Sequence, residues 1–116
     1  MSYDLDFWRY KPGTTLDHQE VYQKLCDGRE VAGLETLPIT DIRQAIADAF
    51  AQGWQQVGAD SWESQTGAFQ LYTTSQFVRV DCYGMAGDDM NKIIDVLLEF
   101  NCPLYDPQVG ERFVVG

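Results

Sequence analysis

The chain has 116 residues, and 18 acidic against 8 basic side chains give it a formal net charge of −10. This length suits a single domain, residues 1–116, and the apolar content is that of a folded globular protein. The acidic composition argues against binding to nucleic acid or to an anionic membrane, because phosphate contacts need Lys and Arg. It favours a basic protein partner through electrostatic steering, while solubility alone is an equally simple explanation.

The chain carries no recognisable targeting or cofactor signal. No apolar run approaches the roughly 20 residues that span a bilayer, and the first residues lack the basic and apolar regions of a signal peptide. We therefore expect a cytoplasmic protein. Cys26, Cys82 and Cys102 are widely spaced, and with one histidine and no Cys-x-x-Cys motif we expect free thiols and neither a metal nor a cofactor.

The first half of the chain predicts a strand followed by two helices. Apolar and polar residues alternate over residues 3–10, which is typical of a strand. A first helix is predicted from a cap at Thr14 or Thr15 to about Cys26. After a connector over residues 29–37, apolar residues recur at helical spacing and predict a second helix: Ile39, Ile42, Ile46, Phe50 and Trp54.

The second half predicts a hairpin, a helix and short strands. Residues 67–74 and 76–83 alternate in the manner of two antiparallel strands around a short polar turn. Residues 88–98 form an amphipathic pattern that opens with two aspartates and is stopped by Pro103. Short strands are predicted at residues 104–106 and 111–115, and Trp62 is a candidate for another within the loop of residues 55–65.

Together these elements predict an α+β fold. We expect an antiparallel sheet with the helices packed on one face, in a ferredoxin-like βαββαβ order with an extra helix. The second face of the sheet is then partly open to solvent. Nine apolar side chains from the strands and helices are expected to be buried together: Leu5, Phe7, Ile46, Phe50, Leu71, Val78, Val80, Ile93 and Leu97.

The open sheet face is the main candidate for a partner-binding site. Aromatic side chains interleave with carboxylates there, and Trp, Tyr and Arg are enriched at protein interfaces. The alternative is that the loop of residues 55–65 or the C-terminal tail covers this face. The candidate partner-binding residues are Asp4, Asp6, Trp8, Tyr10, Tyr72, Asp81 and Tyr83 on the sheet, with Asp60, Trp62 and Glu63 in the loop.

No catalytic motif accompanies these residues. Asp4, Asp6 and Asp81 could hold Mg²⁺ or Ca²⁺, but no EF-hand or phosphate-loop pattern is present, and a solvated acidic face is the simpler interpretation. His18 is the only histidine, and no Gly-x-Ser-x-Gly nucleophile motif occurs. We therefore expect a protein that is not an enzyme.

Three short segments carry a resemblance to a known class of proteins. They are the opening Ser-Tyr-Asp-Leu-Asp-Phe-Trp, the stretch from Phe50 to Trp54, and Leu104-Tyr105-Asp106-Pro107-Gln108. With the size and acidity of the chain, they resemble immunity proteins of bacterial contact-dependent growth inhibition and related polymorphic toxin systems. The resemblance implies a non-enzymatic protein that neutralises the toxic domain of a cognate effector, often a nuclease, by binding and masking it.

Two other interpretations stay open. A small enzyme or ligand-binding domain could use the open sheet face as its pocket, which would require a deep cavity with converging polar groups. A homodimerising accessory subunit could bury the same face in a two-fold contact, so the free protein is expected to be a monomer or a homodimer.

Overall fold

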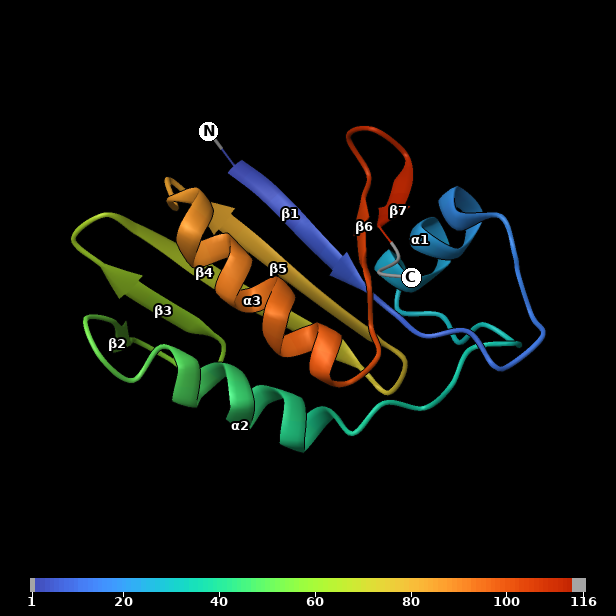
Figure 1. Cartoon of the computed structure of the whole chain (residues 1–116), viewed down its shortest axis with the longest axis horizontal. Helices are drawn as coiled ribbons and strands as arrows, with labels where there is room; N and C mark the ends of the chain where they lie inside the picture. Colours follow the sequence, from blue (N-terminus) through green and yellow to red (C-terminus); the bar gives the residue numbers. More distant parts are fainter. Residues whose placement is uncertain (1, 114–116) are drawn as a thin grey trace.

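An antiparallel sheet runs through the molecule in the computed structural model, which describes residues 2–113. Within these residues the sheet has seven strands and is accompanied by three helices (Figure 1). The helices are α1 (His18–Cys26), α2 (Ile39–Ala49) and α3 (Gly87–Glu99). The strands are β1 (Ser2–Phe7), β2 (Gln55–Gln56), β3 (Ser61–Ser64), β4 (Gly67–Thr74), β5 (Phe77–Tyr83), β6 (Leu104–Asp106) and β7 (Glu111–Phe113).

The hairpin of β4 and β5 is confirmed, and β1 extends it. Leu71 on β4 lies opposite Val80 on β5, and Leu5 on β1 lies opposite Val80 on its other side. Because side chains alternate along a strand, these three residues share one face of the sheet. The alternation seen in the sequence therefore specifies which side of each strand is buried.

Helices α2 and α3 cover that face. The nine residues expected in the core are all buried, and they belong to one cluster between the two helices and the sheet. Helix α3 ends where Asn101 adopts a left-handed backbone conformation with φ of 61°, just before Pro103. The amide of Cys102 donates to the carbonyl of Leu97 at 2.9 Å, which closes the helix end and turns the chain toward β6.

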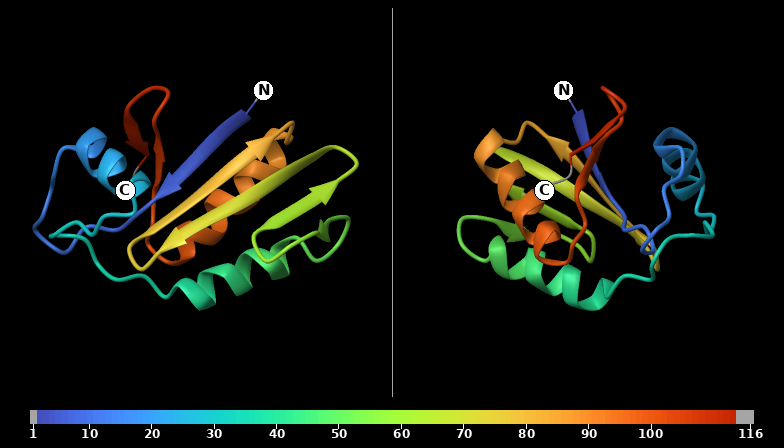
Figure 2. Two further views of the ribbon diagram at one scale, coloured as in Figure 1. Left: turned by 180° about the vertical axis from the view of Figure 1, so that it is seen from behind. Right: turned by 45° about the vertical axis from the view of Figure 1, so that its right-hand side comes forward.

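Helix α1 corrects the expectation that the helices share one face. It packs on the opposite side of the sheet from α2 and α3 (Figure 2). The physical reason is a second apolar cluster on that side. Burying Trp8, Phe77 and Tyr105 there, away from water, stabilises the position of α1. The cluster consists of Trp8, Val21, Leu25, Val31, Leu34, Phe77 and Tyr105.

The ferredoxin-like order is not confirmed, because the strand order differs. The observed order is β2-β3-β4-β5-β1-β6-β7, with all neighbours antiparallel. The loop of residues 55–65 forms β2 and β3, so it extends the sheet edge and does not fold over the open face. Strand β7 lies within the final strand predicted at residues 111–115, of which residues 114 and 115 lie outside the described part of the chain.

Helix α1 also begins later than predicted. Its cap is Asp17 and not Thr14 or Thr15: an Oδ1 atom of Asp17 accepts from the amide of Glu20 at 3.0 Å. A carboxylate at this position satisfies a free helical amide and interacts favourably with the helix dipole.

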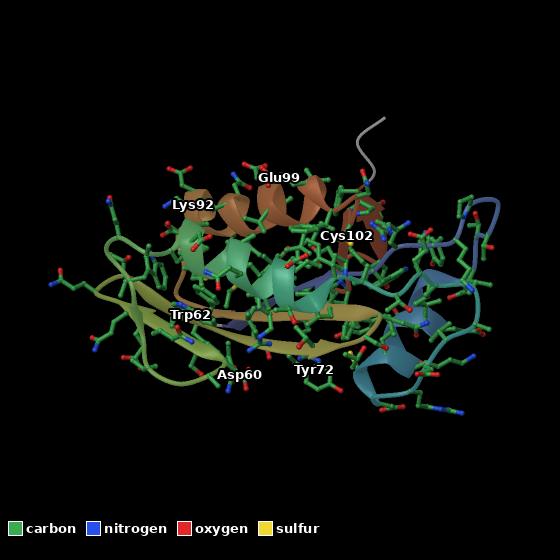
Figure 3. All side chains as sticks on the ribbon, turned by 90° about the horizontal axis from the view of Figure 1, so that it is seen from below. Asp60, Trp62, Tyr72, Lys92, Glu99 and Cys102 are labelled. Carbon is green, nitrogen blue, oxygen red and sulfur yellow. The ribbon has the colours of Figure 1, made fainter. Side chains whose placement is uncertain are left out.

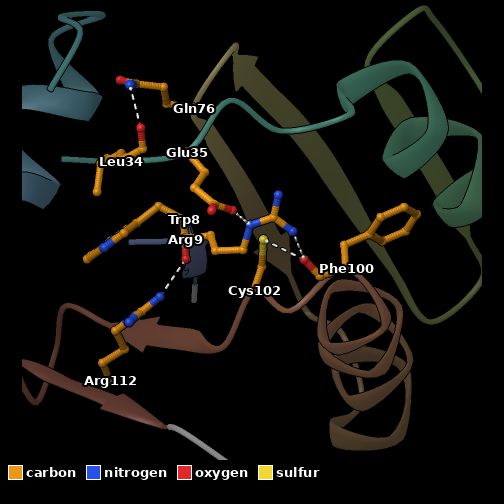
Figure 4. A network of polar contacts seen from close by, with 8 residues as sticks. All are labelled: Trp8, Arg9, Leu34, Glu35, Gln76, Phe100, Cys102 and Arg112. Carbon is orange, nitrogen blue, oxygen red and sulfur yellow. Dashed lines mark hydrogen bonds and ion pairs between the residues drawn. The ribbon is translucent and has the colours of Figure 1, made fainter. Parts of the chain in front are cut away.

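Polar contacts hold the segments on both sides of α1 to the end of the sheet (Figure 4). Arg9 forms an ion pair with Glu35 and donates to the carbonyl of Phe100 at 2.7 Å. Arg112 on β7 donates to the carbonyl of Trp8 at 2.6 Å. The side chain of Gln76 accepts from and donates to the backbone of Val31, at 2.9 and 3.0 Å. These contacts fix where α1 lies over the sheet.

Candidate partner-binding face

Helix α1 covers only part of the sheet surface that faces away from α2 and α3. We call the uncovered part the open face, and its side chains come from β1, β3, β4 and β5: Asp4, Glu63, Gln70, Tyr72, Asp81 and Tyr83. Asp81 lies between Asp4 and Gln70 in neighbouring strands, and Tyr83 lies beside Asp81 along β5. Tyr72 and Tyr83 are 40% and 46% exposed, so both rings are accessible to a partner.

The open face is negatively charged. Its described strand positions carry the carboxylates of Asp4, Glu63 and Asp81, and the adjoining position on β5 carries the guanidinium of Arg79. Arg79 Nε donates to Asp81 Oδ1 at 2.9 Å, so one positive charge is already paired. Asp4 Oδ2 accepts from the hydroxyl of Tyr22 on α1 at 3.0 Å. Carboxylates therefore exceed cations on this surface.

Asp6 does not lie on the exposed surface as expected, because α1 covers it. Its side chain is 0% exposed, and neither carboxyl oxygen accepts a hydrogen bond from a described residue. Burial raises the pKa of Asp6 to about 9, and the neighbouring Asp4 carboxylate adds to this effect by accepting a hydrogen bond from the Asp6 acid and by its negative charge. Asp6 is therefore a neutral carboxylic acid at pH 7, buried directly beneath α1 and beside the open face.

Trp8 is likewise a core residue and not an exposed anchor. Its ring lies 5.0 Å from that of Tyr105 and packs in the cluster under α1. Tyr10 is half-buried, with its hydroxyl 2.7 Å from His18 Nδ1. The guanidinium of Arg112 lies over the Tyr10 ring at 4.6 Å. These two aromatic residues follow the last residue of β1, Phe7, and hold α1 and β7 to that end of the sheet.

The second predicted group, Asp60, Trp62 and Glu63, is divided by the sheet. Trp62 is buried on the helix side, stacked on Phe69 with ring centroids 5.1 Å apart (Figure 3). Asp60 is exposed and bonded to Arg43. Glu63 is exposed at the open face. Alternation along β3 places Trp62 and Glu63 on opposite faces, so they cannot act as one patch.

A shallow cavity of about 390 Å³ lies beside Trp62, on the α2 side. Arg43 lines it and is bonded to Thr73, to the carbonyl of Ala59 and to Asp60. These bonds occupy the guanidinium with protein groups. The cavity lies on the α2 side of the sheet, so it is not the pocket on the open face that the small-enzyme interpretation describes.

Sequence reasoning missed the contribution of α1 to the site. Tyr22 bonds Asp4, and the Cys26 thiol lies 3.4 Å from Arg79 Nη1. The available signal was Phe77 together with Trp8, because two large apolar side chains on a supposedly open face predict a covering element.

No protein family model, curated protein or solved structure matches this chain. Within residues 2–113, no group of three or more His, Cys, Asp and Glu side chains is arranged to hold a metal ion. In the same part of the chain, no helix has the length and apolar character needed to cross a membrane.

Proposed function

We propose that the protein is a non-enzymatic immunity protein of the bacterial cytoplasm, which neutralises a cognate toxin by masking its basic domain. The observation that carries this proposal is the open face, where exposed Tyr72 and Tyr83 flank the Asp4 and Asp81 carboxylates. The three segments that resemble immunity proteins support the same function. The net charge of −10 fits a partner of opposite sign.

The two kinds of side chain have different roles in this proposal. Carboxylates attract a basic surface over distances of about 8–10 Å at physiological salt and so raise the association rate. Exposed tyrosines supply contact area that loses water on binding, and so they slow dissociation. A nuclease domain is a suitable target, because its substrate-binding surface must be basic to contact phosphates.

The test is protection of growing cells. The candidate toxin is the C-terminal domain of a secreted effector encoded beside this gene, expressed with and without this protein. We expect the parent protein to restore growth and the Tyr72→Ala, Tyr83→Ala double variant to fail. The matched control is Val109→Ala with Phe113→Ala, which removes two other exposed apolar side chains, 60% and 47% exposed, on the β6–β7 hairpin outside the strands that form the open face.

Both double variants must retain the melting temperature of the parent, which shows that each is folded. Full protection by the folded Tyr72→Ala, Tyr83→Ala variant would contradict the proposed binding face. Failure of the parent protein to protect against, or to bind, the neighbouring effector domain would contradict the proposed function.

A further inference from the structure

Asp6 and Arg79 are cross-strand neighbours, but their side chains do not bond to each other. They lie directly opposite one another on β1 and β5. The guanidinium of Arg79 instead bonds Asp81 through Nε and the Cys26 thiol through Nη1. Neither oxygen of Asp6 accepts a hydrogen bond from a described residue, and its acid proton has only the Asp4 carboxylate as an acceptor. A buried carboxyl that accepts no hydrogen bond is costly, so a contact with the neighbouring Arg79 would give Asp6 bonds that the observed arrangement lacks.

The position of Asp81 on the open face makes its bond with Arg79 accessible to a partner. Asp4 and Asp81 lie directly opposite one another, and each is only partly buried. A cation from a partner can therefore reach both carboxylates. It would compete with Arg79 for Asp81, and Arg79 would then be free to turn to its cross-strand neighbour.

We propose that Asp4 and Asp81 bind a guanidinium group of a basic protein partner, and that this binding transfers Arg79 from Asp81 to Asp6, with release of one proton. The inference rests on the proposed function, in which the partner is basic. The protons balance: Asp6 begins as a neutral acid, gives its proton to solvent, and ends as a carboxylate paired with Arg79. Arg79 stays charged throughout.

The groups around Asp6 make its ionisation dependent on Arg79. Asp4 and Asp81 disfavour the ionised form through their negative charge, whereas Arg79 favours it. Tyr22 and Cys26 on α1 and Tyr105 on β6 also face Asp6. Those three groups are neutral near pH 7, because burial raises the pKa of each. A contact with Arg79 is therefore the change that can ionise Asp6 within this site.

The coupling predicts how affinity varies with pH. Free Asp6 holds its proton up to a pKa of about 9, and the bound state loses it at lower pH. Affinity should therefore rise with pH, by up to about tenfold per unit, until Asp6 is ionised in the free protein as well. Above that pH the affinity should become constant.

The experiment uses the whole chain and a hexa-arginine peptide as the probe. Binding heats are measured at about pH 7.5 in two buffers with different heats of protonation, which gives the number of protons released. We expect release of close to one proton per peptide from the parent protein. Asp6→Asn should bind the peptide with no proton release, because the amide has the shape of the neutral acid and cannot ionise.

Two further variants complete the test. Asp60→Asn removes an exposed carboxylate outside this cluster and should leave the proton release unchanged. Asp81→Asn removes the competitor for Arg79, so Arg79 should pair with Asp6 without any peptide. The Asp6 pKa, followed by carboxyl carbon NMR, should then fall by two units or more from about 9.

Four results would overturn the inference: no binding of the peptide, binding without proton release, equal release from Asp6→Asn, or an unchanged Asp6 pKa in Asp81→Asn. None of these measurements uses a toxin. Proton release without protection in cells would refute the immunity function and leave the coupling intact. Protection without proton release would refute the coupling and leave the immunity function intact.

Discussion

Arg79 lies directly across the β1–β5 pair from Asp6, yet its guanidinium bonds Asp81 at 2.9 Å, and neither Asp6 oxygen accepts a hydrogen bond from a donor in residues 2–113. This arrangement connects the stability of the protein to pH and to the state of its open face.

Asp6 should make the protein less stable as pH rises. Its pKa is near 3.9 in an unfolded chain and about 9 in the folded protein, so the folded state binds the proton more tightly. The stabilisation is complete below about pH 4 and is lost as pH rises to about 9. Asp6→Asn should remove this dependence and raise the free energy of unfolding at pH 8 by several kcal/mol, since the loss amounts to about 1.4 kcal/mol for each pH unit above about pH 4.

Urea unfolding at a series of pH values measures this effect. Asp60→Asn is the control, because Asp60 is exposed and its replacement should not flatten the pH dependence. An Asp6→Asn variant that kept the slope of the parent protein would show that Asp6 is ionised in the folded state.

Val80→Asp should destabilise the protein by several kcal/mol. Val80 is buried between Leu5 and Leu71, so the variant places an unpaired charge in the core. Gln70→Asp on the exposed side of β4 is the control and should have a small effect. Thermal melting decides the question, and a Val80→Asp variant that melted with the parent would contradict the face assignment of β5.

Trp8→Ala should act on folding and not on partner contact. The ring is fully buried against Tyr105 and Phe77, so its removal should cost about 3–5 kcal/mol of stability. Tyr83→Ala should leave stability nearly unchanged and speed dissociation of the partner, because that ring is 46% exposed. Chemical unfolding and binding kinetics separate the two variants, and the reverse pattern would refute this assignment.

Charge on the open face should act on association. Glu63→Lys with Gln70→Lys changes the net charge by +3 at two exposed positions on this face and should slow association with a basic toxin domain and weaken its salt dependence. Asn91→Lys with Glu99→Lys on α3 makes the same change of net charge on the opposite side of the sheet. Stopped-flow association rates at several salt concentrations should differ between the two double variants. Equal rates would show that the net charge of the protein, and not the open face, controls association.

Folding should not depend on a metal ion. The prediction follows from a single histidine and three widely spaced cysteines in the sequence. Melting curves with and without a strong chelator should coincide. A drop of many degrees in melting temperature on chelation would show that a metal supports the fold. Asp4, Asp6 and Asp81 would then be the candidate ligands.

The sequence by itself determined the elements whose signals are local. Period-two alternation over residues 67–83 is sufficient for the β4–β5 hairpin, because the side-chain period of a strand decides which residues share a face. The spacing of Ile42, Ile46, Ile93 and Leu97 is sufficient for the apolar faces of α2 and α3. The common burial of these residues follows, since both helices must cover the apolar side of one sheet.

Only the tertiary structure decided which polar and aromatic residues are exposed. Alternation places Asp6 and Trp8 on the same side of β1 as Asp4, but it carries no information about what covers that side. Phe77, Tyr105 and α1 come from separate parts of the chain and meet only in the folded protein. Their contacts bury Asp6 and Trp8 and leave Tyr72, Asp81 and Tyr83 accessible, because a single helix of nine residues is too short to cover the whole sheet face.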